Sequence, residues 1–228
     1  SECKYYFSNG SIWTDDVSSQ LVSSIYSWGD GGNGKLGNNC TTGRSSPVSI
    51  VGGFTDWCQL SAGFNHSLAV RTNGTAWAWG SGSYGRLGDN TTVTKSSPVS
   101  VVGGFTDWCQ VAGGYRQSLA VRTNGSAWGW GDNNSGRLGD NSTTDRSSPV
   151  SVVGGFTNWC QISSSWQALA VRTNGTLWAW GAGGNGALGD NTSITKSSPV
   201  SVVGGFTDWC QVSAGGFGGA ATGLSLAV

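Results

Sequence analysis

The chain has 228 residues and carries twelve basic and twelve acidic side chains, which gives a formal net charge of zero. Without an excess of Lys and Arg it lacks the positive surface that nucleic-acid binding requires, so we expect no nucleic-acid partner. No run of about 18 apolar residues occurs, so we expect no membrane insertion.

The first 27 residues follow the pattern of the later sequence only in part. Ser8–Trp13 reads SNGSIW and resembles the TNGTAW of Thr72–Trp77, whereas Thr14–Ser24 looks like an insertion. Ile25–Gly29 then resembles a strand of the later units. The chain has no methionine, not even at position 1, so we interpret its first residue as a processed or trimmed start.

A sequence repeat organises the rest of the chain. The segment WCQLSAGFNHSLAVRTNGTAWAWG at Trp57–Gly80 returns at Trp108–Gly131 and Trp159–Gly181, and a fourth copy runs from Trp209 to Val228. The copies start about 50 residues apart, and a fixed period of this size indicates repeated supersecondary units.

Each unit contains four short strand patterns. In the first full unit we expect strands at Trp57–Leu60, Ser67–Arg71, Thr75–Trp79 and Pro98–Val102. Thr72–Gly74 is expected to form a tight turn, because Asn-Gly tolerates the positive φ angles of a two-residue hairpin. No segment shows a helical period. Four antiparallel strands in about 50 residues are typical of one blade of a β-propeller.

The two ends of the chain predict how the ring closes. Trp209–Val228 supplies only the first two strands of a unit, and residues 1–27 are expected to complete this last blade beside a repeat propeller at 28–228. We therefore predict a single all-β domain, a propeller of four antiparallel four-stranded blades whose terminal strands share one blade. Two alternatives remain: two chains that join into a larger ring, and an open polymer in which one chain's N-terminal strands complete the next chain's last blade.

The repeated motifs resemble a known family. Trp-Gly, Gly-x-Leu-Gly, Ser-Ser-Pro-Val and Ser-Ala-Gly-x-x-His-Ser-Leu-Ala-Val are similar to the regulator-of-chromosome-condensation repeat, from Tyr26 to Val228. The resemblance implies a β-propeller, commonly with seven blades, so four blades are few for this family. It does not imply one function, because members include a nucleotide-exchange factor, a plant ultraviolet photoreceptor and secreted inhibitors of β-lactamase.

Cysteines recur at one position of the unit: Cys58, Cys109, Cys160 and Cys210. Equivalent positions on neighbouring blades are too far apart for a disulfide, which needs Cα atoms within about 7 Å, so we predict small buried residues between blades. Cys3 and Cys40 lie outside the pattern and could form a disulfide that ties the N-terminal segment to the first blade. No Cys or His spacing indicates zinc, and we expect neither a metal nor a cofactor.

Candidate catalytic residues are scarce. The only histidine is His66, whose counterparts in the next two units we take to be Gln117 and Ala168, so we interpret it as structural. Acidic residues recur at one loop position, which indicates loop support and not a unique acid–base pair: Asp89, Asp140 and Asp190. We therefore expect no enzyme activity.

Positions that vary among the units are the candidates for binding. A first variable loop lies between the first two strands of each unit and holds an aromatic residue. Its candidate ligand-binding residues are Phe64, Asn65, His66, Tyr115, Arg116, Gln117, Trp166, Gln167 and Phe217. Aromatic rings with polar neighbours on one propeller face suit sugar stacking or the anchoring of a protein partner. The alternative is that each ring only covers the neighbouring blade.

A second variable loop follows each Trp-Gly. Tyr84 and Arg86 are its contact candidates, and a solvated glycine-rich turn is the alternative. From these loops we predict a non-enzymatic recognition module that binds a cell-surface glycan or protein. A composition rich in Ser, Thr, Asn and Gly favours an extracellular or virion surface. The alternative functions are a structural subunit assembled by strand exchange, hence a homo-oligomer, and an inhibitor of a secreted enzyme.

Overall fold

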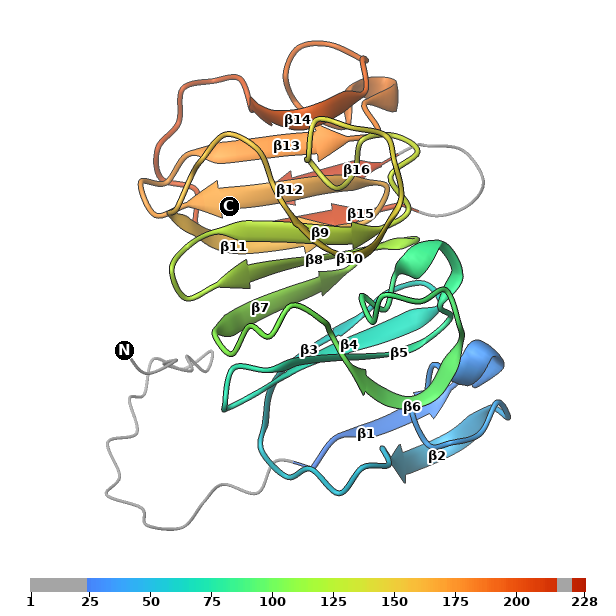
Figure 1. Ribbon diagram of the computed structural model, residues 1–228. Coiled ribbons are helices and arrows are strands. Elements are labelled where there is room, and N and C mark those ends of the chain that lie inside the picture. The colour runs from blue at the N-terminus through green and yellow to red at the C-terminus, as the bar shows by residue number, and fades with distance from the viewer. Residues whose placement is uncertain (1–23, 217–222) are drawn as a thin grey trace, which may run out of the picture.

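The computed structural model describes residues 24–216 and 223–228. Within these residues all strand pairing is antiparallel, in three sheets of four strands and two sheets of two strands (Figure 1). The first pair is β1 (Tyr26–Gly29) and β2 (Arg44–Ser49), and the last pair is β15 (Val212–Gly215) and β16 (Leu224–Ala227). The prediction of an all-β chain built from repeated four-stranded blades is confirmed.

Three complete blades lie between the two pairs. The first blade has β3 (Trp57–Ala62), β4 (His66–Arg71), β5 (Ala76–Gly80) and β6 (Lys95–Ser100). The second has β7 (Trp108–Gly113), β8 (Gln117–Arg122), β9 (Ala127–Gly131) and β10 (Arg146–Ser151). The third has β11 (Trp159–Ser164), β12 (Gln167–Arg172), β13 (Leu177–Gly181) and β14 (Lys196–Ser201). Short 3-10 helices follow β1, β5 and β13: η1 (Gly32–Gly34), η2 (Ser83–Gly85) and η3 (Gly184–Gly186).

The Asn-Gly turn between the second and third strands forms as predicted. Gly74 has a φ of +75°, and the carboxamide oxygen of Asn73 accepts a hydrogen bond from the backbone of Thr75 at 3.1 Å. A Cβ atom on Gly74 would collide with the carbonyl group of Thr106, so only glycine fits this turn. The turn therefore also fixes how the next blade's first strand approaches.

The recurring cysteines correct one sequence prediction. Cys58, Cys109 and Cys160 each mark a register shift in the pairing of the first two strands, as between Trp57 and Gln59. At Cys58 and Cys160 the thiol donates to a backbone carbonyl of the second strand at 3.4 Å. Cys160 and Cys210 are exposed, so the prediction of buried cysteines between blades was wrong for these two. Cys58 and Cys109 are half-buried and pack against the apolar clusters that join neighbouring blades.

Neighbouring blades are joined by the same contacts at each junction. In the first, Leu68 and Val70 pack with Trp130 of the next blade in one buried cluster. The innermost strands also bond through glutamines: the Gln59 carboxamide oxygen accepts from the Val111 amide at 2.7 Å, and Gln110 accepts from Ile162 at 3.0 Å. Both apolar burial and these directional bonds fix the angle between blades.

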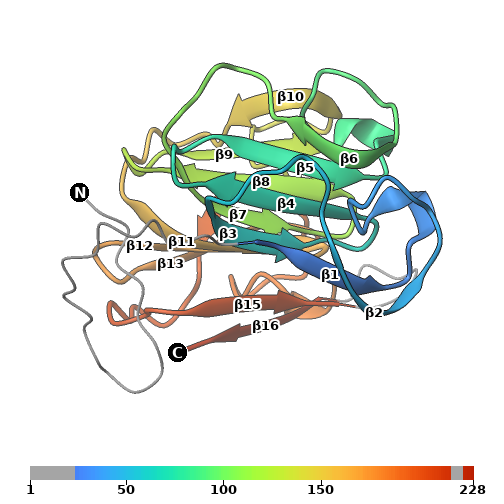
Figure 2. The ribbon, with the colours of Figure 1, turned by 90° about the horizontal axis from the view of Figure 1, so that it is seen from below.

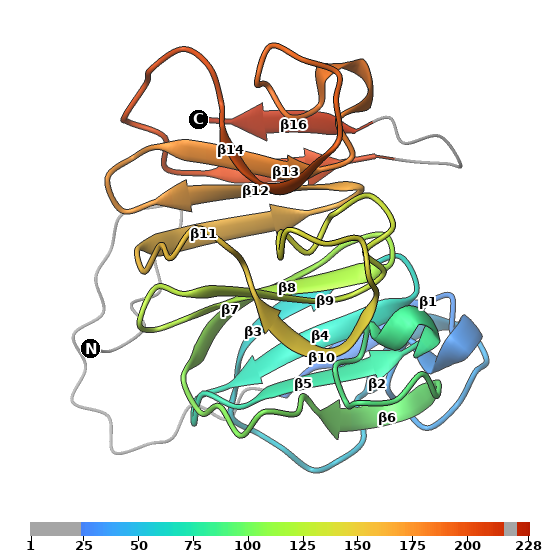
Figure 3. The ribbon, with the colours of Figure 1, turned by 45° about the horizontal axis from the view of Figure 1, so that its top comes forward.

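The two terminal pairs do not meet in the structure. Figures 1 and 3 show β1–β2 and β15–β16 well apart with the complete blades between them, and Figure 2 shows β15–β16 as a separate layer. Each pair is its own two-stranded sheet, so the predicted single blade shared by the terminal strands is not present in the described part of the chain. The junctions set the angle between blades and hold the pairs apart. The strand expected at Ser8–Trp13 and Cys3 of the Cys3–Cys40 disulfide lie outside the described residues.

Candidate functional site

Three aromatic rings form a row across the blades. Phe64, Tyr115 and Trp166 come from the loops between the first and second strands of the three complete blades. The ring centroids of Phe64 and Tyr115 are 4.8 Å apart, and those of Tyr115 and Trp166 are 4.2 Å apart with the rings nearly parallel. We call these three residues the aromatic row. The sequence placed an aromatic residue in each loop, and the structure brings the three into contact.

The backbone holds the aromatic row in place. The amide of Phe64 donates to the Gly114 carbonyl at 3.1 Å, and the amide of Tyr115 donates to the Ser165 carbonyl at 3.2 Å. Phe64 is exposed, whereas Tyr115 and Trp166 are half-buried. Successive loops are therefore pinned to one another while each ring keeps part of its surface in solvent, an arrangement that presents rigid apolar area to a partner.

Arg116 and Tyr84 extend this surface. Because strands alternate in direction along a blade, the loop after the first strand and the loop after the third lie on one face. The Arg116 guanidinium donates to the Tyr84 hydroxyl at 3.1 Å and lies about 5 Å from the ring centres of both Tyr84 and Tyr115. Such a cation over aromatic faces is attracted by the ring quadrupole. Tyr84 is exposed and has a φ of +63°, which is a strained backbone for a bulky residue.

A depression of about 330 Å³ lies beside Arg116 and Tyr84. We call it the Tyr84–Arg116 pocket; it is lined by Tyr84, Arg116, Asp132, Asn134, Thr143 and Asp145. Its wall carries two carboxylates and one guanidinium, so it offers both hydrogen-bond donors and acceptors. Asp132 is itself held by a buried ion pair with Arg137 at 3.1 Å. The pocket is polar, and the aromatic row beside it is apolar.

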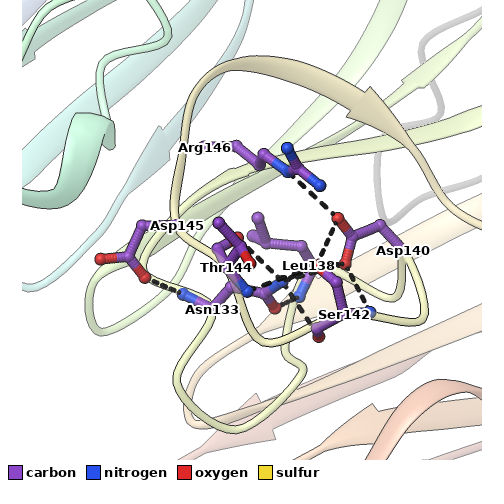
Figure 4. A network of polar contacts seen from close by, with 7 residues as sticks. All are labelled: Asn133, Leu138, Asp140, Ser142, Thr144, Asp145 and Arg146. Atoms are coloured by element: carbon purple, nitrogen blue, oxygen red, sulfur yellow. Dashed lines mark hydrogen bonds and ion pairs between the residues drawn. The ribbon is translucent and has the colours of Figure 1, made fainter.

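A buried asparagine organises the far wall of this pocket (Figure 4). The side-chain amide of Asn133 donates to Asp140 at 2.9 Å and to the Thr144 carbonyl at 3.1 Å, and its oxygen accepts from the Leu138 amide at 3.0 Å. Its backbone amide donates to Asp145 at 2.8 Å. Although burial raises it, hydrogen bonds from Ser142 and Asn133 hold the pKa of the Asp140 carboxyl below its ordinary value. These bonds fix the loop and position Asp145 at the pocket.

Several residues predicted to bind ligand are buried between blades. His66, Gln117 and Gln167 each pair with the last glycine of the third strand, so Gln167 and not Ala168 is the counterpart of His66. The His66 ring nitrogen Nε2 lies 2.9 Å from the Ser118 hydroxyl of the next blade. Gln117 donates to the Ser165 carbonyl at 2.6 Å. These three side chains join neighbouring blades and are too deeply buried to reach a ligand.

Arg86 and Asn65, two further residues that the sequence predicted to bind ligand, are also buried or half-buried. Arg86 is buried, and its Nε donates to the Ser83 carbonyl at 3.0 Å beneath the Tyr84 ring. Asn65 is half-buried, and its carbonyl accepts from the Ser81 amide at 2.8 Å. Phe217 lies outside the described residues. Asp132, Asn134 and Asp145 were not among the predicted residues, although Asn133 stands where the other units have a glycine.

The described residues supply little for catalysis. Burial, together with the nearby charge of Arg86, lowers the pKa of His66 to about 3, so its ring is neutral and enclosed. No group of three or more His, Cys, Asp or Glu in residues 24–216 and 223–228 could hold a metal ion. No helix in the same part of the chain has the length and apolar character of a membrane span.

Consecutive four-stranded blades with a variable loop face define the class of β-propeller interaction modules. The chain belongs to the regulator of chromosome condensation (RCC1) repeat family, whose model matches residues 23–70, 73–121, 124–171 and 174–221. Members of this family are generally non-catalytic binding or exchange-factor modules. The resemblance seen in the sequence is thereby confirmed.

Two relatives match this chain over a little more than half of its length. Human E3 ubiquitin-protein ligase HERC2 is 38% identical over 133 residues, 57% of this chain and 3% of the ligase. The ultraviolet-B receptor UVR8 of Arabidopsis thaliana is 30% identical over 130 residues, 56% of this chain and 30% of the receptor. The chain therefore spans less than a third of the length of either relative.

Solved structures show the same fold. Human WBSCR16 superposes with a TM-score of 0.75 at 21% identity, over 85% of this chain and 51% of that one. Prp20p from Saccharomyces cerevisiae, described with its binding to Gsp1p and histones, superposes at 0.72 and 18% identity, over 83% of this chain and 49% of that one. The described blades thus correspond to about half of each of these chains.

Proposed function

We propose that the chain is a non-enzymatic recognition module that binds a protein partner through the aromatic row and the Tyr84–Arg116 pocket. The observation that carries the proposal is the row itself: three different aromatic residues, contributed by otherwise repeated loops, stacked across neighbouring blades on one face. Several residues that support a blade are the same in the three complete units, such as Leu68, Leu119 and Leu169. The changing rings therefore indicate a requirement other than packing.

The chemistry of the surface matches that of protein-binding hot spots. Aromatic residues and arginine dominate the energetic centres of interfaces, because they bury large areas with few rotatable bonds. Here Phe64 offers exposed apolar area, and Arg116 is held between two rings with its direction fixed. The mixed charges of Asp132, Asp145 and Arg116 beside the rings would select the partner by hydrogen bonds and charge.

A glycan is the second candidate ligand. The Tyr84–Arg116 pocket has carboxylates, a guanidinium and an asparagine next to an exposed tyrosine ring, which suits the hydroxyl groups and apolar face of a sugar. With either ligand we propose an extracellular or virion-surface setting, which the Ser-, Thr-, Asn- and Gly-rich composition supports. Inhibition of a secreted enzyme would use the same surface with a protein as partner.

The test selects ligands for the wild-type chain and asks where they bind. The purified chain is screened against a random peptide display library and, in parallel, a glycan array. Affinity is then measured for a variant with Phe64→Ala and Tyr115→Ala, and for a control with Val93→Ala and Ile194→Ala, two exposed apolar residues outside the row. Loss of two hot-spot rings should weaken binding by about 30-fold or more.

The two screens separate the candidates. Peptide ligands that lose affinity in the row variant and keep it in the control support a protein partner, and array glycans with the same behaviour support a glycan partner. Ligands that bind the row variant as tightly as wild type would overturn the proposed site. Failure of both screens to select any ligand would count against a recognition function.

A further inference from the structure

The loop that follows Trp-Gly occurs four times in the chain and contains an ion pair in two of its copies. The Lys35 ammonium lies 2.7 Å from the Asp30 carboxylate, and the Arg137 guanidinium lies 3.1 Å from that of Asp132. In both copies the acid stands five residues before the base. A third copy has alanine at both positions, Ala182 and Ala187. In these three copies the base and its carboxylate are therefore present together or absent together.

The copy in the first complete blade has the base without the acid. Arg86 stands at the position of Arg137, whereas Ser81 stands at the position of Asp132. Arg86 is 3% exposed, and among the described residues it has no ion pair and one hydrogen bond, from Nε to the Ser83 carbonyl at 3.0 Å. A buried guanidinium without a carboxylate is costly, because its charge is neither hydrated nor neutralised. The loop thus keeps a charge that nothing in the described part of the chain pairs.

The backbone of this loop also offers a donor to a carboxylate. Beside its ion pair, Asp132 accepts a hydrogen bond from the amide two residues later, that of Asn134, at 2.9 Å. The Ser83 amide has the same position relative to Ser81. Ser81 carries no charge, and its hydroxyl donates to the Ser83 hydroxyl at 3.3 Å. One backbone amide and the Arg86 guanidinium therefore stand where the related loop binds its own carboxylate.

Arg86 lies next to the Tyr84–Arg116 pocket. Its guanidinium carbon is 5.6 Å from the ring centre of Tyr84, which is exposed and lines that pocket. Burial lowers the pKa of Arg86, and the nearby charge of Arg116 lowers it further. The enclosed polar atoms without a partner in the described residues do not include the terminal nitrogens of Arg86, so these reach the molecular surface. The unpaired charge is therefore accessible from the side of the proposed binding site.

The charges around this pocket leave an excess of positive charge. Asp132 is engaged by Arg137. In the described part of the chain, Arg86 and Arg116 then face the single carboxylate of Asp145, which lines the pocket. Two guanidinium groups in a partly desolvated site repel each other, and an added anion relieves this repulsion. The pocket therefore favours a negatively charged group on its ligand.

We propose that the protein partner presents a carboxylate, from an Asp or Glu side chain or from its C-terminus, that binds the Arg86 guanidinium and the Ser83 amide beside Tyr84. This carboxylate takes the place that Asp132 occupies in the related loop. Charge-assisted hydrogen bonds of this kind are short and about twice as strong as neutral ones. The identity of the ligand as a protein rests on the proposed function, whereas the unpaired state of Arg86 does not.

The first experiment restores the ion pair within the chain. Ser81→Asp copies Asp132, and Ser81→Asn is a neutral control of the same shape. At pH 7 the Ser81→Asp chain should unfold at a higher urea concentration than both the wild-type and the Ser81→Asn chains. The gain should be lost as the pH falls below about 4, where the new carboxylate is protonated. A Ser81→Asp chain no more stable than Ser81→Asn would overturn the proposal.

A small probe tests the wild-type chain without any selected ligand. N-acetylglutamate α-amide supplies one carboxylate, and N-acetylglutamine α-amide is its neutral match. In NMR titrations of the isotope-labelled chain, the acid should shift the Ser83 amide and Arg86 Nε signals saturably at millimolar concentration, and the neutral match should not. The Ser81→Asp chain should give no such shift.

Two results of this titration would contradict the carboxylate site. Equal shifts in the wild-type and Ser81→Asp chains would show an adventitious anion only. The absence of a shift in the wild-type chain would also overturn the proposal, whether the site is closed to the probe or an acidic side chain of residues 1–23 already fills it.

Peptides selected on the wild-type chain test the chemistry of the partner. Replacing their acidic residue by its amide, or amidating their C-terminus, should weaken binding to the wild-type chain by about tenfold or more. The two changes are made separately and show which carboxylate binds. On the Ser81→Asp chain the acid and the amide should bind equally, because Arg86 is already neutralised.

The outcomes distinguish this proposal from the proposed function. Peptides that lose affinity in the Phe64→Ala, Tyr115→Ala variant but bind equally as acid and amide would keep the proposed function and overturn the carboxylate site. If the screens select no ligand, the proposed function fails, and the NMR titration still decides whether Arg86 binds a carboxylate. Array glycans that bind only when they carry a carboxylate, and only to the chain with Ser81, would replace the protein partner by an acidic glycan.

Discussion

At the scale of single residues, Tyr84 is the most informative side chain. Its backbone has a φ of +63°, whereas the corresponding loops of other units place Asn33 and Asn185 in that conformation at 60° and 56°. Asparagine tolerates left-handed backbone and tyrosine does so at a cost of about 1–2 kcal/mol. Tyr84 is strained and exposed and bonds to Arg116, which agrees with the binding role we propose for it.

Replacing Tyr84 by the asparagine of its counterparts should separate stability from binding. Relief of backbone strain outweighs the lost contact with Arg116, so the Tyr84→Asn chain should unfold at equal or higher denaturant, by up to about 1 kcal/mol. Its affinity for a ligand selected on the wild-type chain should fall about tenfold or more. Urea unfolding and a binding titration measure the two effects, and unchanged affinity would show that Tyr84 is not part of the site.

His66 gives a prediction in pH. Its folded pKa of about 3 lies below the ordinary value of 6.5, so protonation favours the unfolded chain. The stability it contributes is complete above pH 6.5 and is lost as the pH falls toward 3. The His66→Gln chain, which copies Gln117 and Gln167, should lack this loss, so at pH 5 it should retain about 2 kcal/mol more of its neutral-pH stability than wild type. Equal pH profiles in chemical unfolding would contradict a buried neutral histidine.

At the scale of elements, the second blade differs from its neighbours in one loop. In the first and third complete blades the loop has a glycine whose amide donates to a threonine hydroxyl: Gly82 to Thr94 at 3.3 Å and Gly183 to Thr195 at 3.4 Å. In the second blade Asn133 and Asp145 replace this pair, and the asparagine side chain ties the loop together (Figure 4). The exchange places the Asp145 carboxylate at the Tyr84–Arg116 pocket, beside that of Asp132.

Asn133 should therefore be costly to remove unless its partner changes too. Asn133→Ala leaves Asp140 and three backbone groups without these bonds, and should destabilise the chain by about 2–4 kcal/mol. The double variant Asn133→Gly with Asp145→Thr restores the pattern of Gly82 and Thr94, and should recover at least half of that loss. Both variants should weaken ligand binding. The single variant loosens the loop that positions Asp145, and the double variant removes the Asp145 carboxylate. Thermal unfolding of the three chains tests the coupling, and equal losses in both variants would contradict it.

The strands of the blade could be predicted closely, because alternation and the Asn-Gly turn are local signals. The fourth strand was placed at Pro98–Val102 and forms at Lys95–Ser100, since the pairing with the third strand shifts register near Gly80. The role of Gln167 was missed because a one-residue deletion in its loop hides the register. The bulge that exposes Cys160 is likewise set by strand pairing and leaves no mark in the sequence.

At the scale of the whole molecule, the repeat predicted the blades but not their arrangement. The angle between blades depends on contacts such as Gln59 with Val111, which join residues about one repeat apart and have no local signature. The contacts of Tyr115 with Phe64 and with Trp166 likewise join residues about one repeat apart. The sequence could show that each loop varies, and only the fold shows that the variable rings meet on one face.

The most direct test of recognition through this face is hydrogen exchange of the wild-type chain with and without a bound selected ligand. The account predicts added protection in the loops around residues 63–66, 81–86, 114–117 and 164–167, with the Asn-Gly turns on the opposite face unchanged. Protection confined to those turns or to the outer rim near Val93 and Ile194 would contradict it, and would assign the aromatic row to packing alone.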